Sequence, residues 1–170
     1  MAHKPLSLTQ DPLSIIERDF RELYSGELGV SSIRGGQRAA DEALLNLDIT
    51  GYATQRSEVF PKAKRGASVL SPYIRHNILT LSRVYGAVKN APFKDREKFR
   101  DELFWQEYAR HLYARIGTRL FENLRYEANW SAVGNGWNRD MRCIDEVVSE
   151  LESDGWLVNQ TRMWLSLGHD

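Results

Sequence analysis

A short loop that precedes a proline carries chemistry that can be identified from residue types alone. From Gly66 to Ser71 the chain reads Gly-Ala-Ser-Val-Leu-Ser, and Pro72 follows. A small flexible residue, two hydroxyls and a proline at the first turn of a helix offer backbone N–H groups and side-chain donors to an anion at the helix N-terminus. Diphosphate is such an anion. The alternative is an ordinary N-cap, because Ser-Pro is common where helices begin.

A carboxylate lies among aromatic residues in the segment from Asp95 to Gly117, which is predicted to form one long helix. Glu102 falls on the same arc as Trp105, so its carboxylate must find a partner or be solvated in a cleft. The alternative is a Glu near a helix N-terminus, favoured by the helix dipole. Because the apolar side chains spread widely at 100° per residue, we expect protein to cover most of this helix: Phe104, Trp105, Tyr108, Ala109, Leu112, Tyr113 and Ile116.

A third cluster lies near the end of the chain. Asn159, Arg162 and Met163 are three and four residues apart and share one helix face, and Trp156 precedes them by one turn. By themselves these residues also fit a helix cap, a surface arginine and a core methionine.

These segments together resemble the FAD-binding helical domain of the photolyase and cryptochrome family. Its pattern contains a G-T-S-x-L-S loop at the cofactor phosphates and an E-L-x-W-R-E-F helix at the catalytic pocket. The second motif reads Glu-Leu-Phe-Trp-Gln-Glu-Tyr here, from Glu102 to Tyr108. Similar agreement is found at Gly35-Gly36, at Tyr52 to Arg56 (Tyr-Ala-Thr-Gln-Arg), and at Gly155 to Met163 (Gly-Trp-Leu-Val-Asn-Gln-Thr-Arg-Met).

The resemblance implies a FAD-dependent, light-driven lyase that repairs pyrimidine dimers, with damaged DNA as the partner and a dimer flipped into the pocket. It also implies site residues. For FAD these are Tyr52, Ala67, Ser68, Val69, Leu70, Ser71, Trp156, Asn159 and Arg162; for catalysis they are Glu102, Trp105, Asn159 and Met163. The fold it implies is all-α: a multi-helical FAD-binding domain of photolyase/cryptochrome type. Separately from the resemblance, the four scattered histidines lack the spacing of metal ligands and no segment has the apolar length of a membrane span, so we expect neither a metal nor a span.

The chain departs from the family pattern at several places. Ala67, Gln106, Val158 and Gln160 stand where the family has Thr, Arg, His and Arg. The stretch before Gly35 is too short for the pigment-binding domain of the family, so we expect any antenna protein to act in trans. Few residues follow Met163, where the family has further helices. We therefore expect a single partial domain over residues 1–170, incomplete at its C-terminus and impaired in activity, with residues 1–33 as an N-terminal helical extension.

Two functions from other classes fit the same pattern. One is a cryptochrome-like flavin photosensor, which the replacements at Val158 and Gln160 favour slightly. The other is a cofactor-free helical remnant that acts only as an interaction module.

The amino-acid composition limits which of these functions are possible. The 23 basic and 23 acidic residues give no net charge, so DNA would have to bind a local patch. The single Cys143 excludes an internal disulfide, and no signal peptide or 20-residue apolar run is present, which predicts a cytoplasmic protein. The candidate basic patches, which could equally be solvated faces, are Arg56, Lys62, Lys64 and Arg65, and Arg110, Arg115, Arg119 and Arg125.

Helix signals recur along the whole chain. Asp11-Pro12 begins a segment with helical apolar spacing that closes at Gly26. Further helices are predicted over 35–47, from Ser71, from Leu81 or Ser82 to about Asn90, and up to Gly155, with Asn159 beginning the last. No period-2 run indicates a strand.

Overall fold

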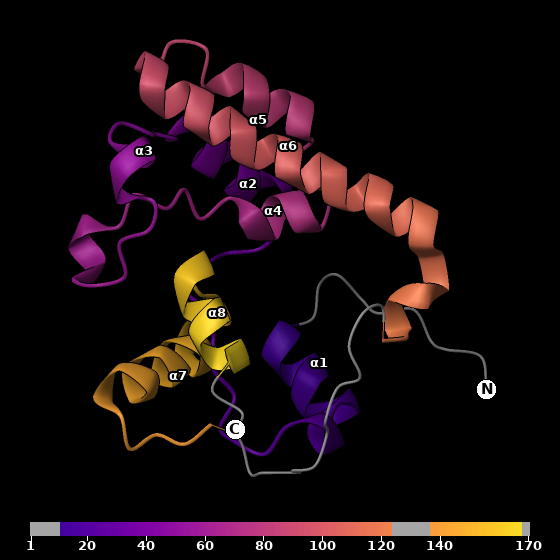
Figure 1. Cartoon of the computed structure of the whole chain (residues 1–170). Coiled ribbons are helices and arrows are strands. Elements are labelled where there is room, and N and C mark those ends of the chain that lie inside the picture. The colour runs from indigo at the N-terminus through magenta and orange to yellow at the C-terminus, as the bar shows by residue number, and fades with distance from the viewer. Residues whose placement is uncertain (1–10, 124–136, 168–170) are drawn as a thin grey trace.

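The computed structural model describes residues 11–123 and 137–167, and every regular element in these two ranges is a helix (Figure 1). The all-α prediction is therefore confirmed at this level. The α-helices are α1 (Pro12–Asp19), α2 (Gln37–Leu45), α3 (Tyr52–Gln55), α4 (Ser71–Arg75), α5 (Leu81–Ala87), α6 (Phe93–Ile116), α7 (Arg142–Asp154) and α8 (Asn159–Leu167). Short 3-10 helices are η1 (Arg21–Leu23), η2 (Lys62–Lys64) and η3 (Gly117–Phe121).

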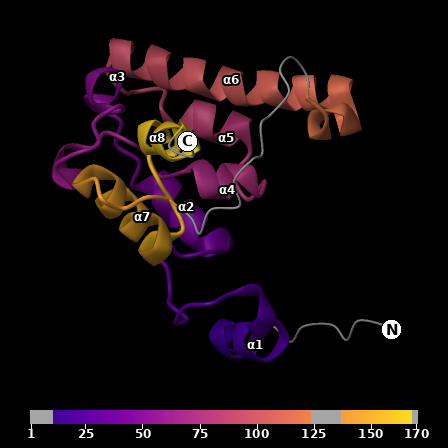
Figure 2. The ribbon, with the colours of Figure 1, turned by 60° about the horizontal axis from the view of Figure 1, so that its bottom comes forward.

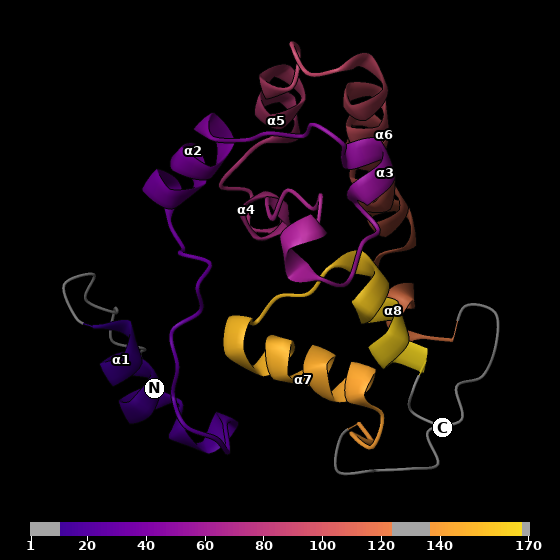
Figure 3. The ribbon, with the colours of Figure 1, turned by 90° about the vertical axis from the view of Figure 1, so that its left-hand side faces the viewer.

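Two separate hydrophobic cores organise these helices. The first joins α2, α4, α5 and the beginning of α6, with Leu79 and Val84 fully buried at its centre. The second joins α7 and α8 around Val147 and Leu165. Figure 3 shows α7 and α8 on one side of the molecule and α2 to α6 on the other. A site that uses residues of both cores can therefore lie only at the boundary between them.

Local sequence explains where the helices of the second core begin and end. Apolar residues at helical spacing run along α7, and the helix stops at Gly155, whose φ of 63° is left-handed. Glycine adopts this conformation without the cost that a Cβ would add. Asn159 is the first residue of α8, as the sequence predicts.

Helix α6 is only partly covered, which corrects the expectation drawn from its wide apolar arc. Its buried residues, Asp95, Phe99 and Leu103, all lie in its first half. Beyond them Phe104 is 59% exposed, Trp105 64% and Tyr108 58%. In Figures 1 and 2 the second half of α6 extends past α4 and α5. The apolar pattern marks side chains that could be covered, but within this chain the first core is too short to reach them.

Asp95 has a different role from the one its position suggests. The long helix begins at Phe93, and Asp95 is a buried residue within its first turn. Its carboxylate accepts hydrogen bonds from the backbone N–H groups of Gly51 (3.0 Å) and Ala53 (2.8 Å). Asp95 therefore caps α3 from a distance and fixes that four-residue helix against α6.

The first part of the described chain lies apart from both cores. Neither α1 nor η1 has a buried residue, and Figure 2 shows α1 at a distance from the other helices. The connection to α2 is extended. The hydroxyls of Ser31 and Ser32 donate to the backbone and side chain of Asp154 at the end of α7.

Candidate functional site

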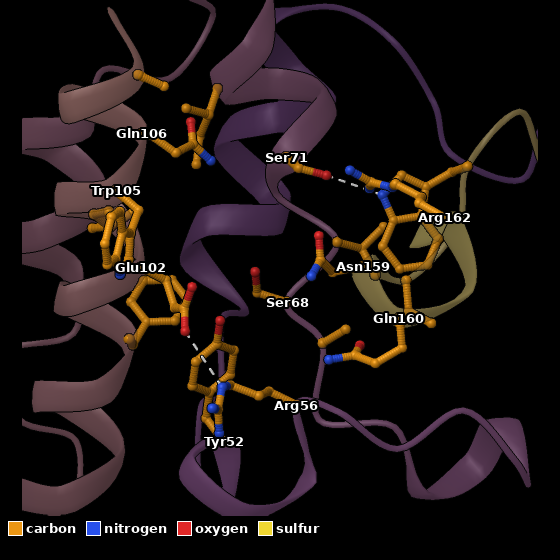
Figure 4. Close-up of a pocket in the computed structure, with 18 residues that line it drawn as sticks. Tyr52, Arg56, Ser68, Ser71, Glu102, Trp105, Gln106, Asn159, Gln160 and Arg162 are labelled. Atoms are coloured by element: carbon orange, nitrogen blue, oxygen red, sulfur yellow. Dashed lines mark hydrogen bonds and ion pairs between the residues drawn. The ribbon is translucent and has the colours of Figure 1, made fainter. Parts of the chain in front are cut away.

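A cavity of about 390 Å³ lies where the two cores meet, open to solvent on one side. Helices α3 and α6 and the segment 67–71 form one part of its wall, and α8 with the residues before it forms the other (Figure 4). The volume falls within the range of small-molecule sites. The structure thus places a pocket at the boundary between the first and second cores.

Most of the site residues expected from the sequence line this cavity. They are Tyr52, Ala67, Ser68, Val69, Ser71, Glu102, Trp105, Trp156, Asn159 and Arg162. Two others do not: Leu70 is 1% exposed within the first core, and Met163 is 48% exposed and outside the cavity wall. Segments more than 100 residues apart in the sequence are brought together at one place.

The loop expected to bind an anion is fixed at its first residue by close packing. The N–H of Gly66 donates to the carbonyl of Gln55 at 3.0 Å. A Cβ on Gly66 would lie 2.9 Å from the Cβ of Gln55 and 3.1 Å from its carbonyl carbon. Only glycine lets the loop approach the end of α3 this closely, so Gly66 places the residues that follow it against the cavity.

Beyond Gly66 the loop keeps its hydrogen-bond donors free. The N–H groups of Ala67, Ser68 and Val69 and the hydroxyl of Ser68 donate no hydrogen bond to any residue in the described part of the chain. Val69 has a φ of 54°, a strained conformation for a β-branched residue. Unpaired backbone donors next to a left-handed residue form the kind of concavity that binds anions.

Ser71 has a different bond from the expected N-cap. It is the first residue of α4, and Leu70 occupies the cap position without a side-chain hydrogen bond. The Ser71 hydroxyl instead accepts from the indole N–H of Trp156 at 3.0 Å (Figure 4). This bond ties the end of the loop to the segment that leads into α8.

Glu102 is held by two cations on the cavity wall. Arg56 Nε lies 3.4 Å and Lys98 Nζ 3.0 Å from the carboxylate Oε1 of Glu102. This carboxylate has therefore found partners, one of the outcomes its position among aromatic residues requires. Burial, together with the nearby charge of Glu102, raises the pKa of the Tyr52 hydroxyl to about 12.

Arg162 is a cation without a carboxylate partner among the described residues. Its guanidinium donates twice to the carbonyl of Leu157, at 2.9 and 2.7 Å, and burial lowers its pKa. Next to it, the amide of Gln160 donates to the hydroxyl of Ser57 at 3.0 Å. With Arg56 and Arg162 against Glu102, the charged groups of the cavity wall favour an anionic ligand.

Several cavity residues were not identified as site residues from the sequence. Ile74, Phe99 and Leu103 are core residues that present one edge to the cavity, and Gln106 and Ala109 extend the α6 wall beyond Trp105. The spacing of Gln106 and Ala109 from Glu102, four and seven residues, is the signal that could have found them. For the core residues no local signal exists.

The first candidate DNA patch is largely neutralised. Arg65 and Lys62 pair with Glu150, and Arg56 pairs with Glu102, which leaves Lys64 without an ion pair within the described ranges. In the second patch, Nη1 of Arg110 lies 3.8 Å from Oε2 of Glu107. Arg125 lies outside the described residues.

None of the described helices is both long and apolar enough to cross a bilayer. No group of three or more His, Cys, Asp or Glu side chains in ranges 11–123 and 137–167 is arranged to hold a metal ion.

Comparison of the chain with models of protein families, with curated proteins and with solved structures finds no match. The function is therefore inferred from the geometry of the site and from the motifs in the sequence.

Proposed function

We propose that this chain binds FAD in the cavity between the two cores and belongs to the light-driven DNA repair lyases that act on pyrimidine dimers. One observation carries the proposal. Five segments of the sequence together resemble the photolyase pattern, and residues from four of them, all but Gly35-Gly36, line one cavity. Segments that form one binding site are expected to match the motifs of one family together. Core segments that share no site have no such reason to match.

The residues present fit the chemistry of FAD. The diphosphate would take the free N–H groups of Ala67, Ser68 and Val69 and the hydroxyl of Ser68, and Arg162 would balance its charge. Charge-assisted bonds to backbone donors are among the strongest in proteins. The indole of Trp156 and the side chain of Asn159 would adjoin the remainder of the cofactor, and the open side leaves room for a ligand longer than the cavity.

The other wall of the cavity would bind the substrate. Trp105 offers a largely exposed aromatic face on which a flipped base can stack, and Glu102 can accept hydrogen bonds from base N–H groups. Arg56 and Lys98 hold the Glu102 carboxylate in position for this. A reduced, photoexcited flavin held here would lend the electron that splits the dimer and would take it back once the ring has opened. The chain's own residues orient both ligands and exclude water between them.

The test is to purify the protein in the presence of FAD and to measure bound flavin by absorbance. Irradiated oligonucleotides are then incubated with it under blue light, and the loss of dimers is measured. Flavin retention that Ser68→Ala weakens, with light-dependent loss of dimers, is the expected result. Protein that retains no flavin at any FAD concentration would contradict the proposal.

A flavin photosensor of cryptochrome type is the second candidate. Val158 is 1% exposed and packs in the interior, and Gln160 is bonded to Ser57. Of two positions that are charged or titratable in the repair enzymes, one is therefore a packing residue here and the other forms a neutral hydrogen bond. Flavin binding and photoreduction without any loss of dimers would favour this function over repair.

A further inference from the structure

The outer face of α6 carries an aromatic patch that the described elements leave largely exposed, although the Phe104 ring lies against Tyr85 of α5. Phe104, Trp105 and Tyr108 are each more than half exposed, and Leu112 is 38% exposed one turn further on. Phe104, Trp105 and Tyr108, with Lys98 and Asp101, line a shallow groove on this face. In Figure 2 the described helices lie on one side of α6, leaving its other side free. A patch of this kind on a soluble protein marks an interaction surface.

Two unpaired charges of opposite sign flank the patch. Asp101 lies seven residues before Tyr108 and Arg115 seven residues after it, so all three fall on nearly the same side of the helix, because two turns take 7.2 residues. Within the part of the chain that is described, neither Asp101 nor Arg115 has an ion-pair partner. The distance between them along α6 is about 21 Å at 1.5 Å per residue.

We infer that this face binds a second copy of the chain, with the two α6 helices antiparallel and a two-fold axis at Tyr108. Because Trp105 also lines the cavity, this dimer and the proposed DNA substrate compete for its ring. In that arrangement Asp101 of each copy lies opposite Arg115 of the other, and Leu112 lies opposite Phe104. Leu112 then enters the groove of the second copy. A two-fold interface must be self-complementary in this way, with each residue pair occurring twice. A parallel pairing would instead set Asp101 against Asp101 and Arg115 against Arg115.

The area available agrees with a weak dimer. Aromatic side chains offer about 150 to 250 Å² each, so three that are roughly 60% exposed, together with Leu112 and the flanking charges, contribute on the order of 500 Å² from each copy. The total of about 1,000 Å² is near the lower limit for a specific interface. The absence of net charge on the chain removes a general repulsion between copies.

Sedimentation equilibrium over a concentration series tests the inference, without flavin or DNA. The expected result is a mass that rises from the 19.6 kDa of one chain to twice that value and no further. Asp101→Arg creates two repelling pairs at once and should raise the dissociation constant about tenfold or more. Arg115→Asp should also raise the dissociation constant. The double variant Asp101→Arg, Arg115→Asp, which swaps the two charges, should restore the dimer.

Asp140→Arg is the matched control, because Asp140 is exposed and lies outside α6. It makes the same charge change and should leave the dissociation constant within about twofold. The inference would be overturned if the wild-type chain stayed monomeric or formed assemblies of more than two copies. It would also be overturned if Asp101→Arg left the dissociation constant unchanged, or if the double variant did not dimerise. Circular dichroism on every variant checks that a loss of dimer is not a loss of helix.

Discussion

The guanidinium of Arg65 forms a two-pronged contact with the carboxylate of Glu150, which joins the loop in front of the cavity to helix α7. One prong, from Nη2 to Oε2, measures 2.9 Å, and the side chains are only 10% and 3% exposed. The two residues lie 85 positions apart in the sequence. At the other end of the same loop, the indole N–H of Trp156 donates a hydrogen bond to the hydroxyl of Ser71. The cavity loop is therefore held to the second core at both of its ends.

Breaking this pair should destabilise the protein strongly. Glu150→Gln leaves the buried Arg65 without a countercharge, and we expect the free energy of unfolding to fall by about 3 to 5 kcal/mol in urea titrations. Glu152→Gln is the control on the same helix, since Glu152 is 62% exposed and pairs with Arg139. It should cost no more than about 1 kcal/mol. Equal losses for the two variants would show that the pair contributes no more than a surface contact.

The same pair predicts how stability depends on pH. Hydrogen bonds from Arg65 hold the pKa of Glu150 below its ordinary value of 4.5. The stability that the charged carboxylate provides is complete above that ordinary value and is lost as the pH falls through the lower pKa of the folded state. The difference in unfolding free energy between wild type and Glu150→Gln should therefore stay constant from pH 7 to about pH 5 and shrink below it. A difference that shrinks between pH 5 and 7 would contradict this assignment.

Gly66→Ala should displace the cavity loop. The added Cβ would meet the backbone of Gln55 and Arg56 at 3.1 and 3.2 Å, and a backbone cannot move aside as a side-chain end can. We expect a loss of about 1 to 3 kcal/mol in unfolding free energy, as for other overpacked sites. Gly86→Ala in α5 is the control, because nothing lies within 4 Å of its Cβ. It should raise stability by about 0.5 to 1 kcal/mol.

Ser68→Ala should affect the ligand and not the fold. Its hydroxyl has no partner within the described ranges, so unfolding free energy should change by less than about 0.5 kcal/mol. Flavin affinity should fall by about 1.5 to 3 kcal/mol if the hydroxyl donates to a phosphate oxygen. Ser71→Ala should differ, because it also removes the bond to Trp156 and lowers the melting temperature. Fluorescence titration with FAD measures the affinities, and an unchanged value for Ser68→Ala would remove the hydroxyl from the site.

Trp105→Ala should weaken binding of dimer-containing DNA by about 1 to 3 kcal/mol, the contribution of one base–aromatic stack. Because Trp105 is 64% exposed, the fold should survive this change with little loss of stability. Phe99→Ala, on the same helix but 3% exposed, should instead cost about 3 to 5 kcal/mol of unfolding free energy. A collapse of the fold in Trp105→Ala would show that its aromatic ring belongs to the core.

Local signals predicted most of the helices but missed α3 and the end of α1 at Asp19, before the expected Gly26. The residues of the cavity wall were expected from the resemblance to the photolyase pattern, and long-range contacts escaped both. The stop at Gly155 and the start at Asn159 follow from residue type alone. The role of Asp95 does not, because the N–H groups it accepts lie 42 and 44 residues away. The exposure of Phe104 and Tyr108 was missed because an apolar arc has the same sequence pattern whether or not a neighbour covers it.

The placement of the cavity between two cores has a consequence for the order of folding. Each core closes on contacts among its own helices, whereas the cavity needs residues near Tyr52 to meet residues near Arg162. Contacts so distant along the chain carry a large loop-closure cost and form late. We therefore expect the cavity wall to be incomplete until the two cores dock. We expect a ligand that binds in this cavity to slow unfolding and to leave the rate of folding nearly unchanged.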